Sequence, residues 1–347
     1  MTSRERVLLS FAHKEPDRVP CWCGSSPEFW EKAKQSTGFD DEGLRRRLGD
    51  DFRRVFAIYK GPDKGLSPGA TWRSPFGVER MGIGYGQPLT HPLAAVQTEA
   101  DVLDFEWPNP DWVDVGRLRA DASAFGGEYA VLGGDWSPFW HDVIDLLGME
   151  NLFYLMFDRP ELVSLIFKKV TDYYYAVSER IFETAADLID IFFIGNDFGS
   201  KTGPLIGTDL FERFIAPELK RLIHLGHKYG LKVMLHCCGG FRPLIPLMIR
   251  DGLDGLHALQ PYCTGMEPSS LKHDFGSQIL LNGAIDSQKF LIEGNEESVR
   301  QETLRILSIM SGGGGYVAGA SHDYILPETP VENVLAMFDA IHDYRSN

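Results

Sequence analysis

The sequence predicts an α/β fold, and within that class a closed (β/α)8 TIM barrel. Short apolar runs alternate with longer stretches whose apolar residues recur at helical spacing, which indicates parallel strand–helix units. Eight such runs occur, matching the eight strands of this barrel. An open doubly wound sheet is the alternative, but no GxGxxG follows the first run. The 347 residues are enough for one large domain, and we expect residues 1–347 to form a single barrel.

The predicted strands are short and mostly apolar on both faces, as buried parallel strands are. In chain order they are Val19–Trp22, Arg54–Tyr59, Tyr129–Gly133, Leu188–Ile194, Lys232–His236, Gly255–Leu259, Gln278–Leu281 and Gly315–Gly319. The residues before the first strand form an N-terminal extension. Helical patterns follow at Arg159–Thr184, from Thr208 onward, at Phe241–Arg250 and at Thr329–Tyr344.

Residues 60–114 interrupt this alternation. They are rich in glycine, proline and aromatic residues, as in GPDKGLSPGATWRSPFGVERMGIGYGQPLTHP. A loop of this length is rarely structureless inside a compact domain. We therefore expect an inserted segment that forms a small antiparallel β element or a lid over the barrel mouth. Its aromatic stretch Trp72–Tyr85 would exclude water or dock a protein partner.

Composition and charge narrow the class of protein. The formal net charge of −15 disfavours nucleic acid as a partner, because phosphate binding needs clustered lysine and arginine. No apolar run approaches the roughly 18–20 residues that span a bilayer, and the charged N-terminus does not resemble a signal peptide. Five cysteines, an odd number, do not indicate a disulfide framework. We expect a cytoplasmic protein that binds neither nucleic acid nor membrane.

A metal site is the functional hypothesis that the fifth strand suggests. In a (β/α)8 barrel the catalytic residues lie at the carboxyl ends of the strands. Side chains alternate along a strand, so His236 and Cys238 face the same way and Cys237 faces the other. An imidazole and a thiolate on one face suit Zn²⁺. Cys237 is interpreted as a small buried hydrophobic residue.

The third metal ligand is expected after the last strand, which lies beside the first in a closed barrel. His322 follows that strand, in the stretch GASHDY. With His236 and Cys238 it would give three protein ligands and one open position, the arrangement of catalytic zinc. The alternative is that His322 is structural, as lone histidines more often are.

Other strand ends carry polar and aromatic side chains. Two carboxylates are candidate catalytic groups. Asp197 could act as a general base, a substrate anchor or a metal neighbour, and Asp286 could fix the tautomer of a metal-bound histidine. The alternative role of Asp197 is a turn or helix cap. The candidate substrate-binding residues are Asn196, Gln260, Asn282, Trp136 and Trp140. For the two tryptophans, core packing is an equally good interpretation.

Several stretches resemble a known superfamily. They are RERVLLSFAHKEPDRVP, GNDFGSKTGPLIGTDLFERFIAPELKRLIHLGHKYGLKVMLHCCG, LQP, LNGAIDSQ and GGGGYVAGASHDYILPETPVENVLAMFDAI. Together they make nearly the whole chain similar to the uroporphyrinogen decarboxylase superfamily. The His-x-Cys-Gly block is the most specific part. It is similar to the corrinoid-dependent methyltransferase branch and not to the porphyrin decarboxylases.

That resemblance implies a barrel with zinc at its mouth, held by a His-x-Cys pair and a ligand near the last strand. The pair matches His236 and Cys238. It also implies a reaction in which a methyl group moves between a separate corrinoid protein and a second substrate. That substrate is either a thiol or a methoxylated or alcohol compound, which is then demethylated. Better-known members use a cysteine in a GxGC-like stretch as third ligand. This chain has no cysteine after Cys263, and His322 is the nearest substitute. Fold analogy adds a homodimer.

Two other functions stay open at this point. The decarboxylase branch carries an RQAGRY-like motif that grips substrate carboxylates, whereas the equivalent region here reads CWCGSSPEFWEKA. A polycarboxylate would also meet a negatively charged protein, which disfavours porphyrin decarboxylation. A metal-free lyase that uses Asp197 is therefore one alternative. The other is a non-catalytic small-molecule-binding protein on the same scaffold.

Overall fold

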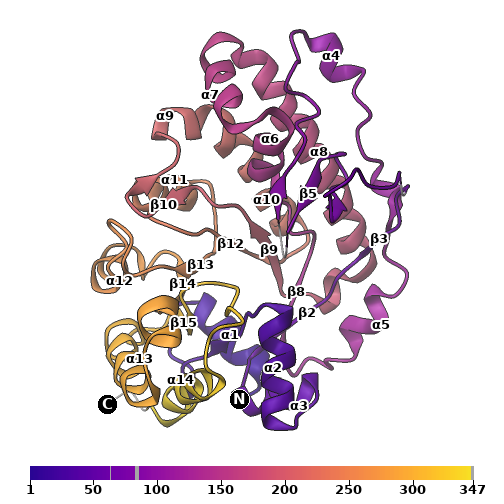
Figure 1. Ribbon diagram of the computed structural model, residues 1–347. Coiled ribbons are helices and arrows are strands. Elements are labelled where there is room, and N and C mark those ends of the chain that lie inside the picture. The colour runs from indigo at the N-terminus through magenta and orange to yellow at the C-terminus, as the bar shows by residue number, and fades with distance from the viewer. Residues whose placement is uncertain (63, 83–85, 345–347) are drawn as a thin grey trace.

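The computed structural model describes residues 1–62, 64–82 and 86–344, and its centre is a parallel eight-stranded sheet. The strands pair in the order β1-β15-β14-β13-β12-β9-β8-β2, every neighbouring pair being parallel (Figure 1). Their bounds are β1 Cys21–Trp22, β2 Phe52–Arg54, β8 Ala130–Gly133, β9 Ile191–Gly195, β12 Lys232–His236, β13 Gly255–Leu259, β14 Leu280–Ile285 and β15 Tyr316–Ala320. The predicted α/β barrel is confirmed.

The barrel is nearly closed, and Asp51 joins its first two strands. The backbone N–H of Asp51 donates to the carbonyl of Cys21 over 3.0 Å, and its carboxylate accepts the N–H of Cys21 over 2.8 Å. The guanidinium groups of Arg6 and Arg18 also bond to this carboxylate, each at 2.8 Å. Charge-assisted bonds of this kind hold the closing edge at the amino end of β2.

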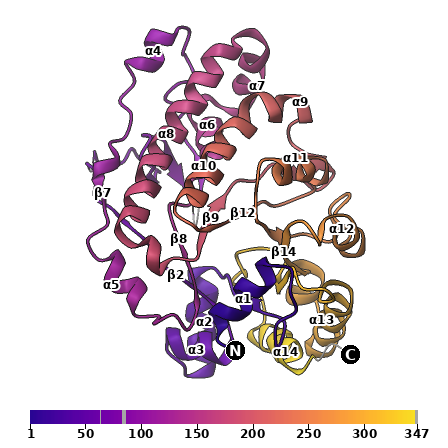
Figure 2. The same cartoon turned by 180° about the vertical axis from the view of Figure 1, so that it is seen from behind.

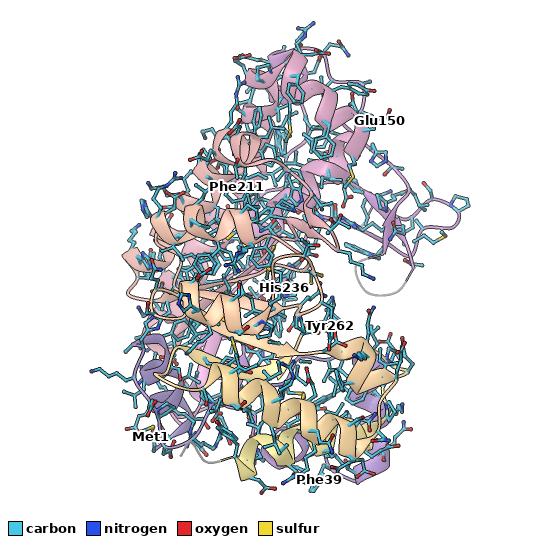
Figure 3. The ribbon with its side chains drawn as sticks, turned by 90° about the vertical axis from the view of Figure 1, so that its left-hand side faces the viewer. Met1, Phe39, Glu150, Phe211, His236 and Tyr262 are labelled. Carbon is cyan, nitrogen blue, oxygen red and sulfur yellow. The ribbon has the colours of Figure 1, made fainter. Side chains whose placement is uncertain are left out.

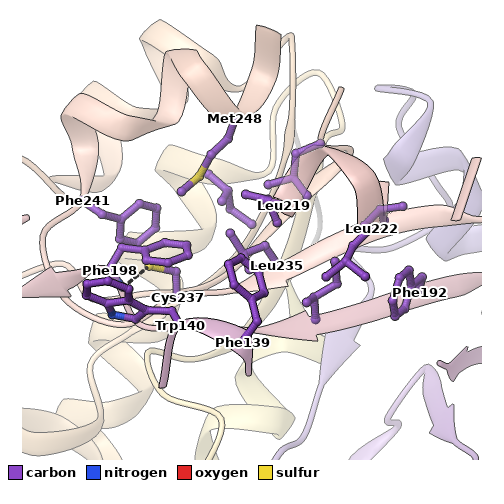
Figure 4. Packing of buried hydrophobic residues seen from close by; sticks show 14 of the residues in the cluster. Phe139, Trp140, Phe192, Phe198, Leu219, Leu222, Leu235, Cys237, Phe241 and Met248 are labelled. Carbon is purple, nitrogen blue, oxygen red and sulfur yellow. Dashed lines mark hydrogen bonds between the residues drawn. The ribbon is translucent and has the colours of Figure 1, made fainter. Parts of the chain in front are cut away.

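Two apolar cores lie on the two faces of the barrel wall. The inner core fills the lumen with residues that include Trp22, Phe52, Phe193, Met234 and Leu280. Helix α1, Ser3–Phe11, closes the amino end of the lumen with Val7 and Phe11. The larger outer core lies between the strands and the surrounding helices, and Figure 4 shows part of it.

Helices surround the barrel, as the alternating pattern predicts (Figure 2). Their bounds are α2 Pro27–Thr37, α3 Asp41–Leu48, α5 Leu118–Ser123, α6 Phe139–Leu147, α7 Met149–Asp158, α8 Pro160–Ala185, α9 Thr208–Leu210, α10 Ala216–Lys228, α11 Ile245–Arg250, α12 Pro268–Phe275, α13 Glu296–Met310 and α14 Val331–Asp343. Local sequence fixes several ends. Asn295, for example, forms a capping box with Ser298 at the start of α13. Of the described helices, none is both long and apolar enough to cross a membrane.

The predicted insertion contains antiparallel β structure. Strands β4 Trp72–Arg73, β5 Glu79–Met81 and β6 Gln87–Pro88 form a three-stranded sheet, and β3 Ile58–Tyr59 pairs with β7 Val113–Asp114. A short helix, α4 Glu99–Leu103, follows the three-stranded sheet. Residues 63 and 83–85, the latter within the predicted aromatic stretch Trp72–Tyr85, lie outside the described residues.

Six of the eight predicted strands have different bounds in the structure, and two of them end several residues from the predicted position. The strand predicted at Arg54–Tyr59 ends at Arg54, because the chain leaves the barrel there and Ile58–Tyr59 pairs outside it. The strand predicted at Gln278–Leu281 runs from Leu280 to Ile285. Asn282 and Gly283 do not favour a strand locally, but pairing with β15 holds them in one. Asn282 therefore lies within a strand and not after it.

Candidate metal centre

The end of β12 places one cysteine in the outer core and the other in the barrel mouth. Met234 belongs to the lumen, so alternation turns His236 and then Cys238 toward the mouth. Cys237 points outward, is fully buried, and accepts a hydrogen bond from the N–H of Phe198 over 3.3 Å (Figure 4). Burial raises the pKa of the Cys237 thiol. The prediction that Cys237 is a buried hydrophobic residue is confirmed.

Asp197, His236 and Cys238 form a group that could hold a metal ion. Their ligand atoms all lie within 4.8 Å of one another. The Sγ of Cys238 is 3.2 Å from Nε2 of His236, and that nitrogen is 3.5 Å from Oδ1 of Asp197. Nitrogen, sulfur and carboxylate oxygen are the donors that proteins offer to zinc. Figure 3 shows His236 deep in the molecule, with Tyr262 nearer its edge.

The charges in this group favour a cation. Burial and the nearby carboxylate of Asp197 raise the pKa of the Cys238 thiol well above its usual range. Burial also opposes ionisation of Asp197, but the imidazoles of His141 and His236 and the N–H of Cys238, which donates over 2.7 Å, hold the pKa of that carboxyl well below normal. A bound cation would displace the thiol proton and compensate the carboxylate. The donor set therefore fits a zinc ion.

His257 holds His236 from behind. The two residues pair across β12 and β13, and their Nδ1 atoms lie 3.0 Å apart. Burial lowers the pKa of His257 to about 3, so it is neutral at physiological pH. If Nε2 of His236 faces the metal group, then Nδ1 of His236 carries the proton and donates it to Nδ1 of His257. The ring proton of His257 then lies on its Nε2, which is 3.8 Å from Oδ1 of Asp323. At His236 this tautomer-fixing contact comes from His257, and the tautomer-fixing role expected of Asp286 stays a prediction.

Asp286 and Gln260 shape the loops around the centre. The carboxylate of Asp286 accepts the N–H of Lys289 over 2.6 Å and caps the helical turn Ser287–Ile292. The amide oxygen of Gln260 accepts the N–H of Gly239 over 2.8 Å, which fixes the turn directly after Cys238. Neither contact excludes a second role, and the predicted roles of these residues in catalysis and substrate binding stay predictions.

His322 lies near the centre but outside the group of three. Its ring centroid is 6.0 Å from that of His236, and the two rings are perpendicular. Its Nδ1 accepts the N–H of Tyr324 over 3.0 Å, which leaves Nε2 for another partner. The place of His322 as third ligand stays a prediction, and Asp197 is the residue whose oxygen already lies beside His236 and Cys238.

The predicted substrate-binding residues divide into buried and accessible ones. Asn196 is fully buried, and its amide bonds to the N–H of Trp140 and the carbonyl of Ser137. Trp140 is also fully buried and stacks on Phe167 in the outer core. Both residues also line the cavity beside His236, and their predicted role in substrate binding stays a prediction. Trp136, in contrast, lies with its ring centroid 5.4 Å from that of His236, at the wall of the mouth.

Buried polar atoms without partners lie in the lumen near the centre. Asn282 follows Leu280 on the lumen face of β14 and is fully buried. In the described part of the chain, neither its amide nitrogen and oxygen nor Nε2 of His257 has a hydrogen-bond partner. Buried polar groups are nearly always satisfied, so these atoms are exceptions that an ordered water or a ligand would satisfy.

Two cavities flank the centre. One of about 810 Å³ is lined by residues that include Arg54, Trp136, Asp197 and His236. The other, of about 880 Å³, is lined by Cys238, Gln260 and Asp286 among others. His322 and Tyr324 line both. Pockets of this size accommodate small organic molecules or part of a larger cofactor.

Sequence reasoning missed His257, Asp323 and Arg54. A usable signal existed for His257, which is the third residue of a strand that pairs in register with β12. The carboxylate of Asp323 follows His322 directly, and its Oδ1 accepts a hydrogen bond from Nε1 of Trp22 over 3.2 Å.

Comparison with known proteins places the chain in a family. Residues 116–344 match the model of the family described as Uroporphyrinogen decarboxylase (URO-D). The chain belongs to the URO-D family. Its match to the methylcobamide:CoM methyltransferase MtbA of Methanosarcina mazei is 20% identical and covers 99% of this chain and 98% of that protein. Its match to the uroporphyrinogen decarboxylase of Myxococcus xanthus is 26% identical and covers 76% of this chain and 74% of that protein.

A solved structure confirms the fold of this URO-D family member. The methyltransferase from Methanosarcina mazei superposes with a TM-score of 0.68 at 18% identity, covering 99% of both chains. Such a likeness extends through the amino-terminal region and the insertion, which the family model does not match.

Proposed function

We propose that this URO-D family member is a zinc-dependent methyltransferase, which moves a methyl group between a corrinoid protein and a thiol or a methoxylated or alcohol substrate. The observation that carries the proposal is the group Asp197, His236 and Cys238 at the barrel mouth. The match to MtbA supports it because it covers nearly all of both chains, whereas the match to the Myxococcus xanthus decarboxylase covers about three quarters.

In this proposal His236 and Cys238 hold the zinc, with Asp197 or His322 as the third ligand. When bound, the ion supplies a Lewis acid that favours the thiolate form of a thiol or stabilises a departing oxygen. His257 fixes the ring of His236 and accepts its Nδ1–H. Gln260 keeps the turn after Cys238 in place.

Asp197 acts through its negative charge. Because its pKa is held well below the usual range, it is a weak proton acceptor at neutral pH. We therefore assign it to orienting the cysteine and stabilising a cation, and of the roles expected from the sequence we propose metal neighbour over general base. Its bond to the N–H of Cys238 serves the same purpose.

The insertion closes one side of the substrate cavity. Trp72, Gln87 and Pro88 of the three-stranded sheet line the cavity that also contains His236. We propose that this sheet limits the access of water and forms part of the surface on which the corrinoid protein docks. Methyl transfer benefits from a dry site, because hydrolysis and competing protonation are suppressed there.

A metal-free decarboxylase-like lyase is the second candidate, and the match to the Myxococcus xanthus enzyme favours it. It would use the same mouth, with Asp197 as its main charged group. It predicts full activity after chelation, because no step depends on a metal ion.

Metal content decides between these functions. We would measure zinc by mass spectrometry in the wild type and in Cys238→Ser, Asp197→Asn and His322→Ala, with Cys263→Ser as control because Cys263 lies outside the group. The expected result is about one zinc per chain, lost in Cys238→Ser and retained in Cys263→Ser. Loss in Asp197→Asn or in His322→Ala identifies the third ligand. No zinc in any preparation, even after reconstitution, would refute the methyltransferase.

A further inference from the structure

Arg54 is a cation in the mouth that the proposed methyl transfer does not use. It is the last residue of β2, and Phe52, two residues earlier, belongs to the lumen. Alternation therefore turns Arg54 inward, whereas Arg53 points outward. Arg54 is half-buried and lines the same cavity of about 810 Å³ as His236 and Asp197.

Aromatic rings surround the Arg54 guanidinium. Its Cζ lies 4.8 Å from the ring centroid of Phe56, 5.0 Å from that of Trp136 and 5.1 Å from that of Phe193. Trp136 in turn contacts the ring of His236. Aromatic faces stabilise a guanidinium by cation–π attraction but accept none of its in-plane N–H groups. The donors of Arg54 therefore need another partner.

Within residues 1–62, 64–82 and 86–344, no hydrogen bond or ion pair reaches Arg54. The neighbouring Arg53 shows the contrast, because its guanidinium bonds to both carboxylate oxygens of Glu42 and to two backbone carbonyls. Burial lowers the pKa of Arg54, and the nearby carboxylates of Asp323 and Asp135 oppose that shift. These carboxylates are engaged elsewhere, Asp323 with Nε1 of Trp22 and Asp135 with the N–H of Ser137.

We propose that Arg54 binds the oxyanion, a carboxylate or a sulfonate, of the small-molecule substrate. A guanidinium presents parallel N–H groups that match such an oxyanion in a bidentate manner. Trp136 contacts both Arg54 and His236, so the apolar body of the substrate packs on its ring while the reacting atom reaches the metal group. The proposal rests on the proposed function, since it names the substrate class of that site.

The test measures binding in metal-stripped protein, where zinc cannot attract the probe. The probes are benzoate, benzenesulfonate and neutral benzamide, and binding is followed by calorimetry and by quenching of tryptophan fluorescence. The variants are Arg54→Gln and, as a control, Arg117→Gln, whose side chain is 80% exposed. We expect at least one acid to bind the wild type and Arg117→Gln at least about ten-fold more tightly than Arg54→Gln. The tighter acid identifies the oxyanion, and benzamide should not distinguish the variants.

Two results would overturn the oxyanion site. One is that neither acid binds the wild type more tightly than Arg54→Gln. The other is that Arg54→Gln lowers the melting temperature of the ligand-free protein as strongly as removal of a fully paired buried arginine does, which would assign Arg54 to the fold. Because the assay needs no metal, its failure leaves a zinc-containing methyltransferase intact. Equally, a protein without zinc that still binds the acids through Arg54 retains the oxyanion site and loses only the methyltransferase.

Discussion

The arginines at the two ends of the barrel differ in whether they are paired. At the amino end, Asp51 is fully buried, and its carboxylate accepts bonds from Arg6, Arg18 and the N–H of Cys21. At the carboxyl end, Arg54 has no hydrogen bond or ion pair among the described residues, and the side chain of Asn282 is unpaired as well.

This difference separates the structural end from the functional end. A paired buried charge contributes to the fold, because removing one partner leaves the other charge buried without compensation. An unpaired polar group costs free energy in the empty protein and regains it when a ligand or water supplies the partner. We therefore expect substitutions at the amino end to lower stability, and substitutions at the mouth to change binding.

The largest effect is expected for Asp51→Ala. It leaves the guanidinium groups of Arg6 and Arg18 without their shared carboxylate and removes the side-chain bond to the N–H of Cys21 at the β1–β2 edge. We expect the free energy of unfolding to fall by about 3–5 kcal/mol, measured by urea denaturation. Arg54→Gln is the matched mouth variant and should lose less than about 1 kcal/mol. Equal losses in the two variants would contradict the division between the ends.

Next in size is the effect of His257 on metal affinity. His257→Phe removes the acceptor for Nδ1–H of His236 but keeps the volume of a ring. We expect zinc affinity to fall by roughly 10–100-fold, measured by competition with a chromophoric chelator. His273→Phe, whose side chain is 87% exposed, is the control and should keep wild-type affinity. Unchanged affinity in His257→Phe would mean that the ring of His236 is held by other contacts.

The acid sensitivity of the mouth follows from the same histidine. Burial lowers the pKa of His257 to about 3, whereas the pKa of a histidine in an unfolded chain is about 6.5. Between these values the unfolded state binds one more proton, so the free energy of unfolding falls as pH decreases, by up to about 1.4 kcal/mol per pH unit. Denaturation of wild type and His257→Phe across this range should show a shallower decline in the variant. Parallel curves would place the proton on another group.

The smallest effect is expected for Asn282→Leu. The change replaces an unpaired buried amide by an apolar side chain of similar size, so the empty protein should gain about 1 kcal/mol of stability. Asn333→Leu is the matched control, because the amide of Asn333 donates to the carbonyls of Leu291 and Gly294. That variant should lose stability in the same urea assay. A loss of similar size in Asn282→Leu would indicate an internal partner for its amide.

The sequence by itself determined the architecture and one pair of the candidate ligands. The bounds of Lys232–His236 and Gly255–Leu259 agree with the structure, because hydrophobic runs between polar segments mark buried strands. Alternation along one strand was enough to turn His236 and Cys238 toward the mouth and Cys237 toward the outer core. Such relations involve neighbours in sequence, where covalent geometry fixes direction.

Only the tertiary structure decided which residues from other strands meet that pair. Asp197 comes from the end of β9, His257 from β13 and Arg54 from β2, and their contacts depend on register and on where each strand ends. A strand boundary misplaced by a few residues hid the inward direction of Arg54 and the lumen position of Asn282. The physical reason is that pairing with neighbouring strands, more than local propensity, sets strand ends and register, so contacts between strands appear only once the barrel is assembled.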